Sequence, residues 1–95
     1  MRSEANFGKA LKQLREMVEV TQEDFGLVSS RTYISTVERG LKSPTLGKIE
    51  QLAEVLGVHP LTLLTVAYMD RLTPKEVERT TAALRAQLLE IVSEK

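Results

Sequence analysis

Basic and hydroxyl side chains that could bind a polyanion gather in one stretch of the chain, residues 31–48. Four basic residues stand there against the single acid Glu38, a local charge of +3, although the whole chain is neutral. Residues 49–73, in contrast, carry a local charge of −2. Because cationic groups bind phosphate oxygens and arginine and hydroxyl groups bind base edges, this distribution predicts a nucleic-acid-binding surface. The four bases are Arg31, Arg39, Lys42 and Lys48.

The other side chains do not combine into a catalytic or metal-binding group. His59 is the only histidine, and it has none of the neighbouring cysteines or clustered carboxylates of a metal site. Ser29, Ser30 and Ser35 have no base or acid partner of the kind that a serine nucleophile needs. A glycine-rich phosphate loop is also absent from the sequence. We therefore expect a non-enzyme with no metal, no cofactor and no small-molecule ligand.

Length and composition limit the fold to a small helical one. The 95 residues suffice for one domain, or one domain with an appended element. Aromatic residues are only 4% of the chain, so leucine, isoleucine, valine and alanine must form the core. Cysteine is absent, which excludes disulfides and fits a reducing compartment. We find neither an apolar run of about 20 residues nor a secretory signal, and we expect a cytoplasmic protein without membrane contact.

Short breaks divide the chain into six expected helices, and no strand pattern is present, so the fold class is all-α. The first helix is expected from about Ala5 to Val18, because Phe7, Leu11, Leu14 and Val18 recur at helical spacing. The second is expected to begin at Thr21, with Asp24 completing a capping box, and to end near residues 28–29.

The third helix is expected at residues 31–39, after a tight turn. Ser29 or Ser30 can cap its start, and Gly40 suits its end. Ile34 and Val37 are expected to face the core. The residues expected to face outward are Arg31, Thr32, Ser35, Thr36 and Arg39.

Two further helices follow a loop at residues 41–44. The fourth is capped by Thr45 and ends at Gly57, and the fifth opens with Pro60, a favoured first-turn residue. The residues expected to be buried are Leu46, Ile49, Leu52, Ala53 and Leu56 in the fourth helix, and Leu61, Leu64 and either Val66 or Ala67 in the fifth.

The sixth helix has the clearest start signal, because Thr73, Pro74 and Glu76 combine an N-cap, a first-position proline and a capping-box acid. It is expected to run to about Ser93. Its apolar residues recur every three or four positions as a heptad seam, although the core has no evident need of another helix. We expect this helix, with residues 66–69, to form a homodimer or a tetramer; the alternative is that it folds back on its own chain. The seam residues are Val77, Thr81, Leu84, Leu88 and Ile91.

Several of these features occur together, in the same order, in one known family. The segments are Thr-Gln-Glu-Asp-Phe-Gly at 21–26, Arg-Thr-Tyr-Ile-Ser-Thr-Val-Glu-Arg-Gly at 31–40, Pro-Thr-Leu at 44–46 and Leu-Ala-Glu-Val-Leu-Gly-Val at 52–58. They resemble the XRE family of Cro-like and lambda-repressor-like helix-turn-helix regulators. The resemblance covers about residues 5–66. Residues 31–35 are particularly similar to the controller proteins of restriction–modification systems.

The resemblance implies a five-helix, lambda-repressor-like DNA-binding domain at residues 1–70, with its helix-turn-helix core at 21–40. The remaining residues, 71–95, are then expected to be a C-terminal oligomerisation helix. In this docking geometry the third helix lies in the major groove, where Arg31 can bind guanine O6 and N7 and short side chains allow close approach. We expect base contacts from Arg31, Thr32, Ser35 and Thr36.

Other residues are expected to position the protein on double-stranded DNA. Gln22 matches a family glutamine that binds phosphate at the start of the second helix. Arg15 and Glu38 match a family salt bridge between the first and third helices, so we assign Glu38 to orientation. The remaining phosphate candidates are Arg39, Lys42 and Lys48, and more weakly Lys9 and Lys12.

The turn of the motif departs from the family pattern. Phe25 and Ile34 are nine residues apart, where the family usually places the equivalent pair eleven apart. The usual turn glycine is absent, and Gly26 stands where the family usually has alanine. We therefore expect a changed angle between the second and third helices.

Two functions from different classes follow from these observations. The leading hypothesis is a sequence-specific transcriptional regulator that binds an operator as a homo-oligomer and acts as a repressor or autoregulator. The alternative is a helical protein–protein interaction module, or an antitoxin-type partner-binding protein. The shortened turn and zero net charge favour the alternative, whereas the basic stretch at 31–48 favours DNA binding.

Overall fold

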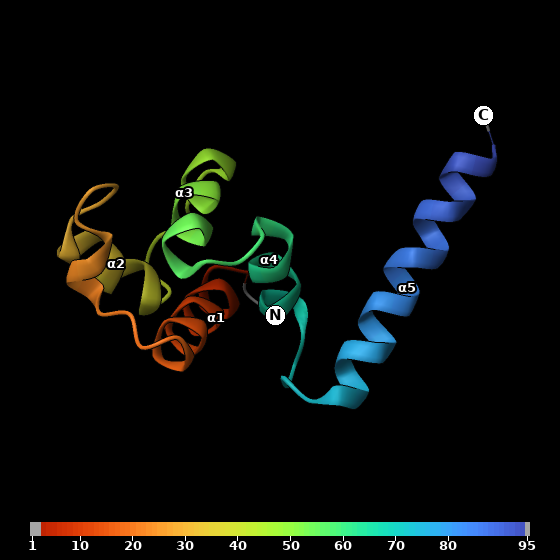
Figure 1. Ribbon diagram of the computed structural model, residues 1–95, viewed down its shortest axis with the longest axis horizontal. Coiled ribbons are helices and arrows are strands. Elements are labelled where there is room, and N and C mark those ends of the chain that lie inside the picture. Colours follow the sequence, from red (N-terminus) through yellow and green to blue (C-terminus); the bar gives the residue numbers. More distant parts are fainter. Residues whose placement is uncertain (1–2, 95) are drawn as a thin grey trace.

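The computed structural model describes residues 3–94, and its regular structure over this range is entirely helical (Figure 1). The predicted all-α fold class is therefore confirmed. Residues 1, 2 and 95, which the predicted two-part division includes, lie outside the described residues. The elements are α1 (Ser3–Met17), η1 (Gln22–Phe25), α2 (Arg31–Glu38), α3 (Leu46–Leu56), α4 (Pro60–Tyr68) and α5 (Pro74–Ser93).

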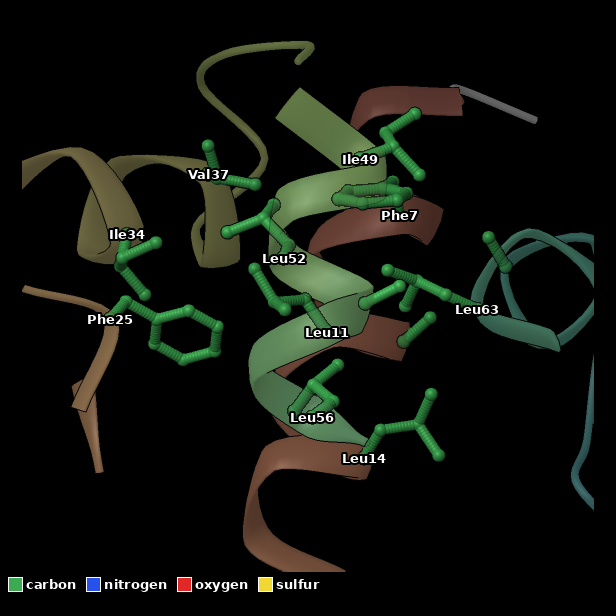
Figure 2. Close-up of a cluster of buried hydrophobic side chains, with 13 residues drawn as sticks. Phe7, Leu11, Leu14, Phe25, Ile34, Val37, Ile49, Leu52, Leu56 and Leu63 are labelled. Atoms are coloured by element: carbon green, nitrogen blue, oxygen red, sulfur yellow. The ribbon is translucent and has the colours of Figure 1, made fainter. Parts of the chain in front are cut away.

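One apolar core joins the elements from α1 to α4, and α5 stands apart from them in Figure 1. Figure 2 shows the labelled side chains of α1 and α3 at the centre of this core, with Phe25 and Ile34 on the side of α2 and Leu63 on the side of α4. The core is aliphatic apart from two phenylalanines, as the composition predicts. Its buried residues are Phe7, Ala10, Leu11, Leu14, Phe25, Ile34, Val37, Ile49, Leu52, Ala53, Leu56, Leu63 and Ala67.

The predicted stripe of α1 is buried except at its last member. Phe7, Leu11 and Leu14 lie in the core, whereas Val18 is 42% exposed. The helix ends at Met17, and Glu19 adopts a positive φ of 60°. The backbone therefore turns away before Val18 can continue the apolar stripe.

The second helix differs most from the prediction, because η1 is a four-residue 3-10 helix and ends well before residue 28. Its predicted capping box is present: Asp24 N–H donates to Thr21 Oγ1 over 3.2 Å, and Thr21 N–H donates to Asp24 Oδ2 over 2.8 Å. A 3-10 helix rises about 2.0 Å per residue, compared with 1.5 Å in an α-helix. It therefore spans more distance with fewer residues, which allows the shortened segment to bury Phe25 and still reach α2.

The start and end of α2 follow from two local signals. Ser30 is the N-cap, and its Oγ accepts a hydrogen bond of 3.0 Å from Tyr33 N–H. Gly40 follows the helix with a φ of 77°, a conformation that glycine adopts at low cost. Ile34 and Val37 are completely buried, as predicted, so they fix which face of this short helix points outward.

The predicted starts of α3 and α4, with Thr45 as the cap of α3 and Pro60 in the first turn of α4, are present, but the first leucine of each helix does not lie in the core. Leu46 is 73% exposed and Leu61 is 64% exposed, although both were expected to be buried. These residues belong to the first turns, where the helices have not yet come onto the core. In α4 the buried positions are Leu63, which was not predicted, and Ala67, which was one of the two predicted alternatives. Leu64 is only partly buried against the core.

Gly8 allows α1 to lie directly against the end of α2. A Cβ atom at this position would lie 2.7 Å from the carbonyl oxygen of Glu38 and would also clash with that of Val37. Real Cβ atoms do not approach backbone oxygens this closely. Glycine normally weakens a helix by about 1 kcal/mol relative to alanine, so the close packing must offset that cost.

The substitution Gly8→Ala is expected to destabilise the protein, because α1 and α2 must separate to admit the methyl group. We expect a loss of about 1–3 kcal/mol in the free energy of unfolding, the usual range for overpacking. Urea denaturation followed by circular dichroism measures this quantity.

Gly47 in α3 provides the matched control. The nearest group to an added Cβ there is Thr45 Oγ1 at 4.0 Å, so alanine fits without displacement. Gly47→Ala should leave stability unchanged or raise it by up to about 1 kcal/mol through helix propensity alone. Equal effects of the two substitutions would show that Gly8 is not a packing constraint.

The last helix, α5, buries none of its described residues. Its predicted start is present: Thr73 Oγ1 accepts a hydrogen bond of 3.2 Å from Glu76 N–H, and Pro74 occupies the first turn. The alternative that this helix folds back and covers its seam on the same chain is not what the structure shows. The seam faces solvent in the single chain.

Candidate nucleic-acid interface

The outer face of α2 brings together most of the residues predicted to contact DNA. Arg31, Thr32 and Arg39 are exposed, and Ser35 and Thr36 are partly exposed. A shallow hollow runs along this face and joins it to η1. The hollow is lined by Gln22, Arg31, Thr32, Ser35 and Arg39. Thr36, Lys42 and Lys48 do not line it.

Arg31 is held only weakly in the single chain. Its Nε lies 3.2 Å from a carboxylate oxygen of Glu23, but the two side chains are 69% and 66% exposed. Exposed ion pairs of this kind contribute about 0–1 kcal/mol. Arg31 can therefore exchange Glu23 for a base edge or a phosphate at little cost.

The hydroxyl of Thr36 is already used inside α2, because Oγ1 donates a hydrogen bond of 2.8 Å to the carbonyl oxygen of Thr32. This bond fixes the orientation of the threonine side chain, which is partly exposed. A side chain fixed in this way suits contact with a thymine methyl or with a donor on a base edge.

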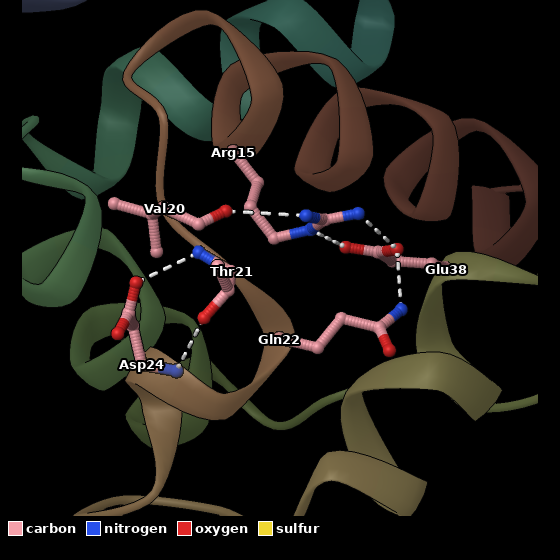
Figure 3. Close-up of polar contacts among 6 residues, drawn as sticks. All are labelled: Arg15, Val20, Thr21, Gln22, Asp24 and Glu38. Atoms are coloured by element: carbon pink, nitrogen blue, oxygen red, sulfur yellow. Dashed lines mark hydrogen bonds and ion pairs between the residues drawn. The ribbon is translucent and has the colours of Figure 1, made fainter.

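The end of α2 is fixed by an ion pair between Arg15 on α1 and Glu38 (Figure 3). Arg15 Nε and Nη2 donate to the two carboxylate oxygens over 2.6 and 3.2 Å, and Nη1 donates to the carbonyl oxygen of Val20 over 3.1 Å. Gln22 Nε2 donates to Glu38 Oε1 over 3.0 Å. The Glu38 carboxylate thus joins α1, η1 and α2 at one point.

This cluster is well shielded from water. The side chains of Arg15 and Glu38 are only 14% and 5% exposed. The hydrogen bond to Glu38 raises the pKa of Arg15 above its usual value, and partial burial only partly opposes this effect. Glu38 therefore holds the helices in place and does not present its carboxylate to the outer face.

Gln22 stands at the boundary between this cluster and the hollow. One of its amide hydrogens is used by Glu38, which leaves the amide oxygen and the other hydrogen for a further partner. The bond to Glu38 fixes the side chain beside the outer face of α2. Sequence reasoning assigned Gln22 to phosphate but missed that it also contacts Glu38.

The substitution Glu38→Gln is expected to lower the free energy of unfolding by about 2 kcal/mol. The neutral amide leaves the guanidinium of Arg15 shielded from water without its charged partner, and hydrogen bonds to charged groups contribute about 1.5–3 kcal/mol. Denaturant unfolding measures the change. Glu50→Gln on the exposed surface of α3 is the control and should have almost no effect. A similarly small effect at Glu38 would contradict the positioning role.

On the other flank of α2, two lysine side chains lie over the ring of Tyr33. The ammonium groups of Lys42 and Lys48 lie 5.7 and 5.6 Å from the centre of its ring, within the range of cation–π attraction. Partial burial raises the pKa of the Tyr33 hydroxyl. Sequence reasoning missed this aromatic contact, because the lysines lie nine and fifteen positions further along the chain.

The two lysines are not equivalent. Lys48 Nζ donates a hydrogen bond of 2.6 Å to the carbonyl oxygen of Val28, which ties α3 to the turn before α2. Lys42 has no such bond to the described backbone. Lys48 therefore has a structural contact as well as its charge, whereas Lys42 contributes charge at the edge of the outer face.

The part of the chain that the structure describes contains no group of three or more side chains that could hold a metal ion. None of its helices is long and apolar enough to cross a membrane.

A short helix and a tight turn thus present a second helix with a buried apolar face and an exposed polar face, and this arrangement defines a helix-turn-helix domain. The sequence profile of the helix-turn-helix family matches residues 11–63, more than half of the chain. The chain therefore belongs to the XRE-type helix-turn-helix family of DNA-binding regulators, as its motifs predicted.

Within this family, the chain is similar to a control protein. The chain is 38% identical to control protein C.BamHI of Bacillus amyloliquefaciens over 61 residues, which cover 61% of this chain and 75% of the relative. The similarity to controller proteins that residues 31–35 indicated is therefore confirmed. The aligned length leaves a substantial part of this chain without a counterpart.

Proposed function

We propose that this protein is a sequence-specific transcriptional regulator that binds operator DNA as a homo-oligomer. The observation that carries the proposal is the outer face of α2, which is polar, exposed and flanked by groups that fix its orientation. Family membership and the similarity to a control protein support the same function. We propose that it acts in the cytoplasm and catalyses no reaction.

In this proposal α2 lies in the major groove and reads base edges. Arg31 leaves its exposed contact with Glu23 and binds a guanine through O6 and N7, a contact that contributes roughly 1–3 kcal/mol of discrimination. The short side chains further along the helix keep its backbone close to the base pairs. The proposed base-contacting residues are Arg31, Thr32, Ser35 and Thr36.

Phosphate contacts on both sides of α2 would set its register. Gln22, fixed by Glu38, lies on one flank, and the lysine pair around Tyr33 lies on the other. Such contacts carry no sequence information, but they determine which base pairs the reading helix meets. The proposed phosphate-contacting residues are Gln22, Arg39, Lys42 and Lys48.

In this proposal DNA binding and oligomerisation belong to different parts of the chain, divided at the predicted boundary after residue 70. We assign DNA binding to residues 1–70 and oligomerisation to 71–95, because the buried core ends at Ala67 and α5 carries a separate exposed seam. A dimer with two reading helices roughly 34 Å apart would match half-sites separated by one turn of DNA. Occlusion of a promoter, including its own, is the simplest regulatory mechanism.

The decisive experiment is selection of bound sequences from a pool of random duplexes. We expect an enriched site made of two related half-sites. The spacing of the half-sites would report the symmetry of the oligomer. Failure to enrich any sequence would overturn the proposal and favour a protein-interaction module.

The substitution Arg31→Ala should weaken binding to the selected site by roughly 5- to 150-fold and relax the base preference at one position per half-site. Fluorescence anisotropy at fixed salt measures the affinity. Arg79→Ala on α5 is the control, since Arg79 is also an exposed arginine, 70% exposed and paired with the glutamate Glu76. A uniform loss of affinity for all sequences would instead identify Arg31 as a phosphate contact.

The substitution Leu88→Glu should dissociate the oligomer, because it places a charge in the seam at a residue that is 62% exposed in the single chain. We expect the self-association constant measured by sedimentation equilibrium to weaken by at least tenfold. Ala86→Glu, at an exposed position off the seam, is the control and should leave association unchanged. A monomeric unsubstituted protein at micromolar concentration would exclude the oligomeric part of the proposal.

A further inference from the structure

The seam of α5 is an exposed apolar strip, interrupted by Thr81, that is not buried against the described residues. Leu88 and Ile91 are 62% and 60% exposed, and Leu89 and Val92 widen the strip near its end with exposures of 52% and 64%. Apolar strips of this kind are normally covered by another surface. Figure 1 shows α5 accessible along its length. The inference below rests on the proposed homo-oligomer and concerns how its helices pair.

The charges beside the seam differ between the two halves of α5. Glu78 and Arg85 are seven residues apart, so they lie along the same edge of the seam, each directly after a seam residue. Within residues 3–94 neither takes part in an ion pair, whereas the neighbouring Arg79 is paired with Glu76 over 2.8 Å. One edge of the seam therefore carries an acid in its first half and a base in its second half.

This arrangement distinguishes the two directions in which α5 could pair with a second copy. In a parallel pair the edge with Glu78 and Arg85 meets the other edge of the partner helix, which carries Thr73, Thr80 and Gln87 and no charge there. In an antiparallel pair equivalent edges meet. Glu78 then lies beside the partner's Arg85, and Arg85 beside the partner's Glu78.

We propose that two copies of this chain associate through α5 in an antiparallel pair, with Thr81 opposite the partner's Leu84. Val77, Thr81, Leu84 and Leu88 then form four layers, in which Val77 meets the partner's Leu88 at each end. Ile91 lies beyond them, opposite the partner's Pro74. Two equivalent ion pairs, each between Glu78 of one copy and Arg85 of the other, lie along one side of the helix pair. All exposed groups in this interface belong to α5, so no surface of the reading helix is used.

Thr81 fits this register better than a parallel one. Its hydroxyl donates a hydrogen bond of 2.7 Å to the carbonyl oxygen of Val77 in the same helix, so the side chain can turn its methyl group to the seam. In the antiparallel register each threonine packs against a leucine. A parallel pair would place two threonines in one layer, which would leave that layer short of apolar volume.

The register also fixes the distance between the two DNA-binding domains. Thr73 at the start of α5 would lie opposite the partner's Val92, so the two helix starts are nineteen residues apart along the pair. At 1.5 Å per residue this distance is about 28 Å, comparable to one turn of DNA. The paired helices would therefore act as a spacer between two reading helices.

Disulfide trapping tests the direction of pairing, because the chain contains no cysteine. The test uses Val77→Cys and Leu88→Cys chains, one of them with a tag that changes its mass, mixed and equilibrated in a glutathione buffer. We expect a covalent dimer of the two different chains, since residues 77 and 88 face each other in the proposed register. Each variant alone is the control and should give no covalent dimer, because identical positions lie about 16 Å apart along the helices.

Three outcomes separate this inference from the proposal on which it rests. Trapping between different chains alone supports antiparallel pairing. Self-trapping of Leu88→Cys overturns it in favour of a parallel pair and leaves the homo-oligomer intact. Absence of any trapping in a protein that sediments as a monomer overturns both.

Charge reversal provides an independent test with the same protein. Glu78→Arg and Arg85→Glu should each weaken dimerisation by about 3- to 30-fold, since two attractive pairs become repulsive. The double variant restores opposite charges across the interface and should recover most of the loss. Failure of the double variant to recover dimerisation, measured by sedimentation equilibrium, would overturn the proposed ion pairs.

Discussion

The Glu38 carboxylate is the point on which the orientation of the reading helix depends. An eight-residue helix such as α2 is too short to be stable in water by itself, so its position must come from its surroundings. Ile34 and Val37 fix which face is buried. They do not prevent the helix from tilting or from sliding along the core. The bonds from Arg15 and Gln22 to Glu38 remove that freedom, because they attach the end of α2 to two other elements.

The bonds of Glu38 also explain how the domain tolerates a shortened turn. The segment expected as the second helix is the four-residue 3-10 helix η1, which buries Phe25 and presents Gln22 beside Glu38. Lys48 contributes from the other side, since its bond to Val28 holds the turn against α3. The contacts of Gln22 with Glu38 and of Val28 with Lys48 thus hold this short segment in place at both of its ends.

Local signals in the sequence predicted much of this fold. The caps at Thr21, Thr45 and Thr73, and the breaks at Gly40 and Gly57, each depend on a few neighbouring residues and were identified correctly. Ser30, the cap of α2, was one of two predicted alternatives. The spacing of apolar residues also predicted most of the core. It failed at Leu46 and Leu61, because periodicity does not show where along its length a helix first meets the core.

Contacts between distant residues could not be predicted in this way. The close approach at Gly8 depends on how α1 and α2 cross, and a glycine within a helix carries no signal of its partner. The arrangement of Tyr33 between two lysines likewise depends on the path of the loop after α2. For the site, the residue types and the outward face of α2 were predictable, and the pairing of Arg15 with Glu38 followed only from family resemblance. The contact of Gln22 with Glu38 required the structure.

The isolation of α5 has a consequence for the lifetime of the protein. A helix of 20 residues that buries none of them is only marginally stable in water, so in a single chain α5 must open frequently. Proteases cleave such opened segments far more readily than a packed core. The C-terminal quarter of an unassembled chain would therefore be degraded first, whereas a partner that covers α5 would protect it. Turnover in the cell would then remove free chains selectively and spare assembled ones.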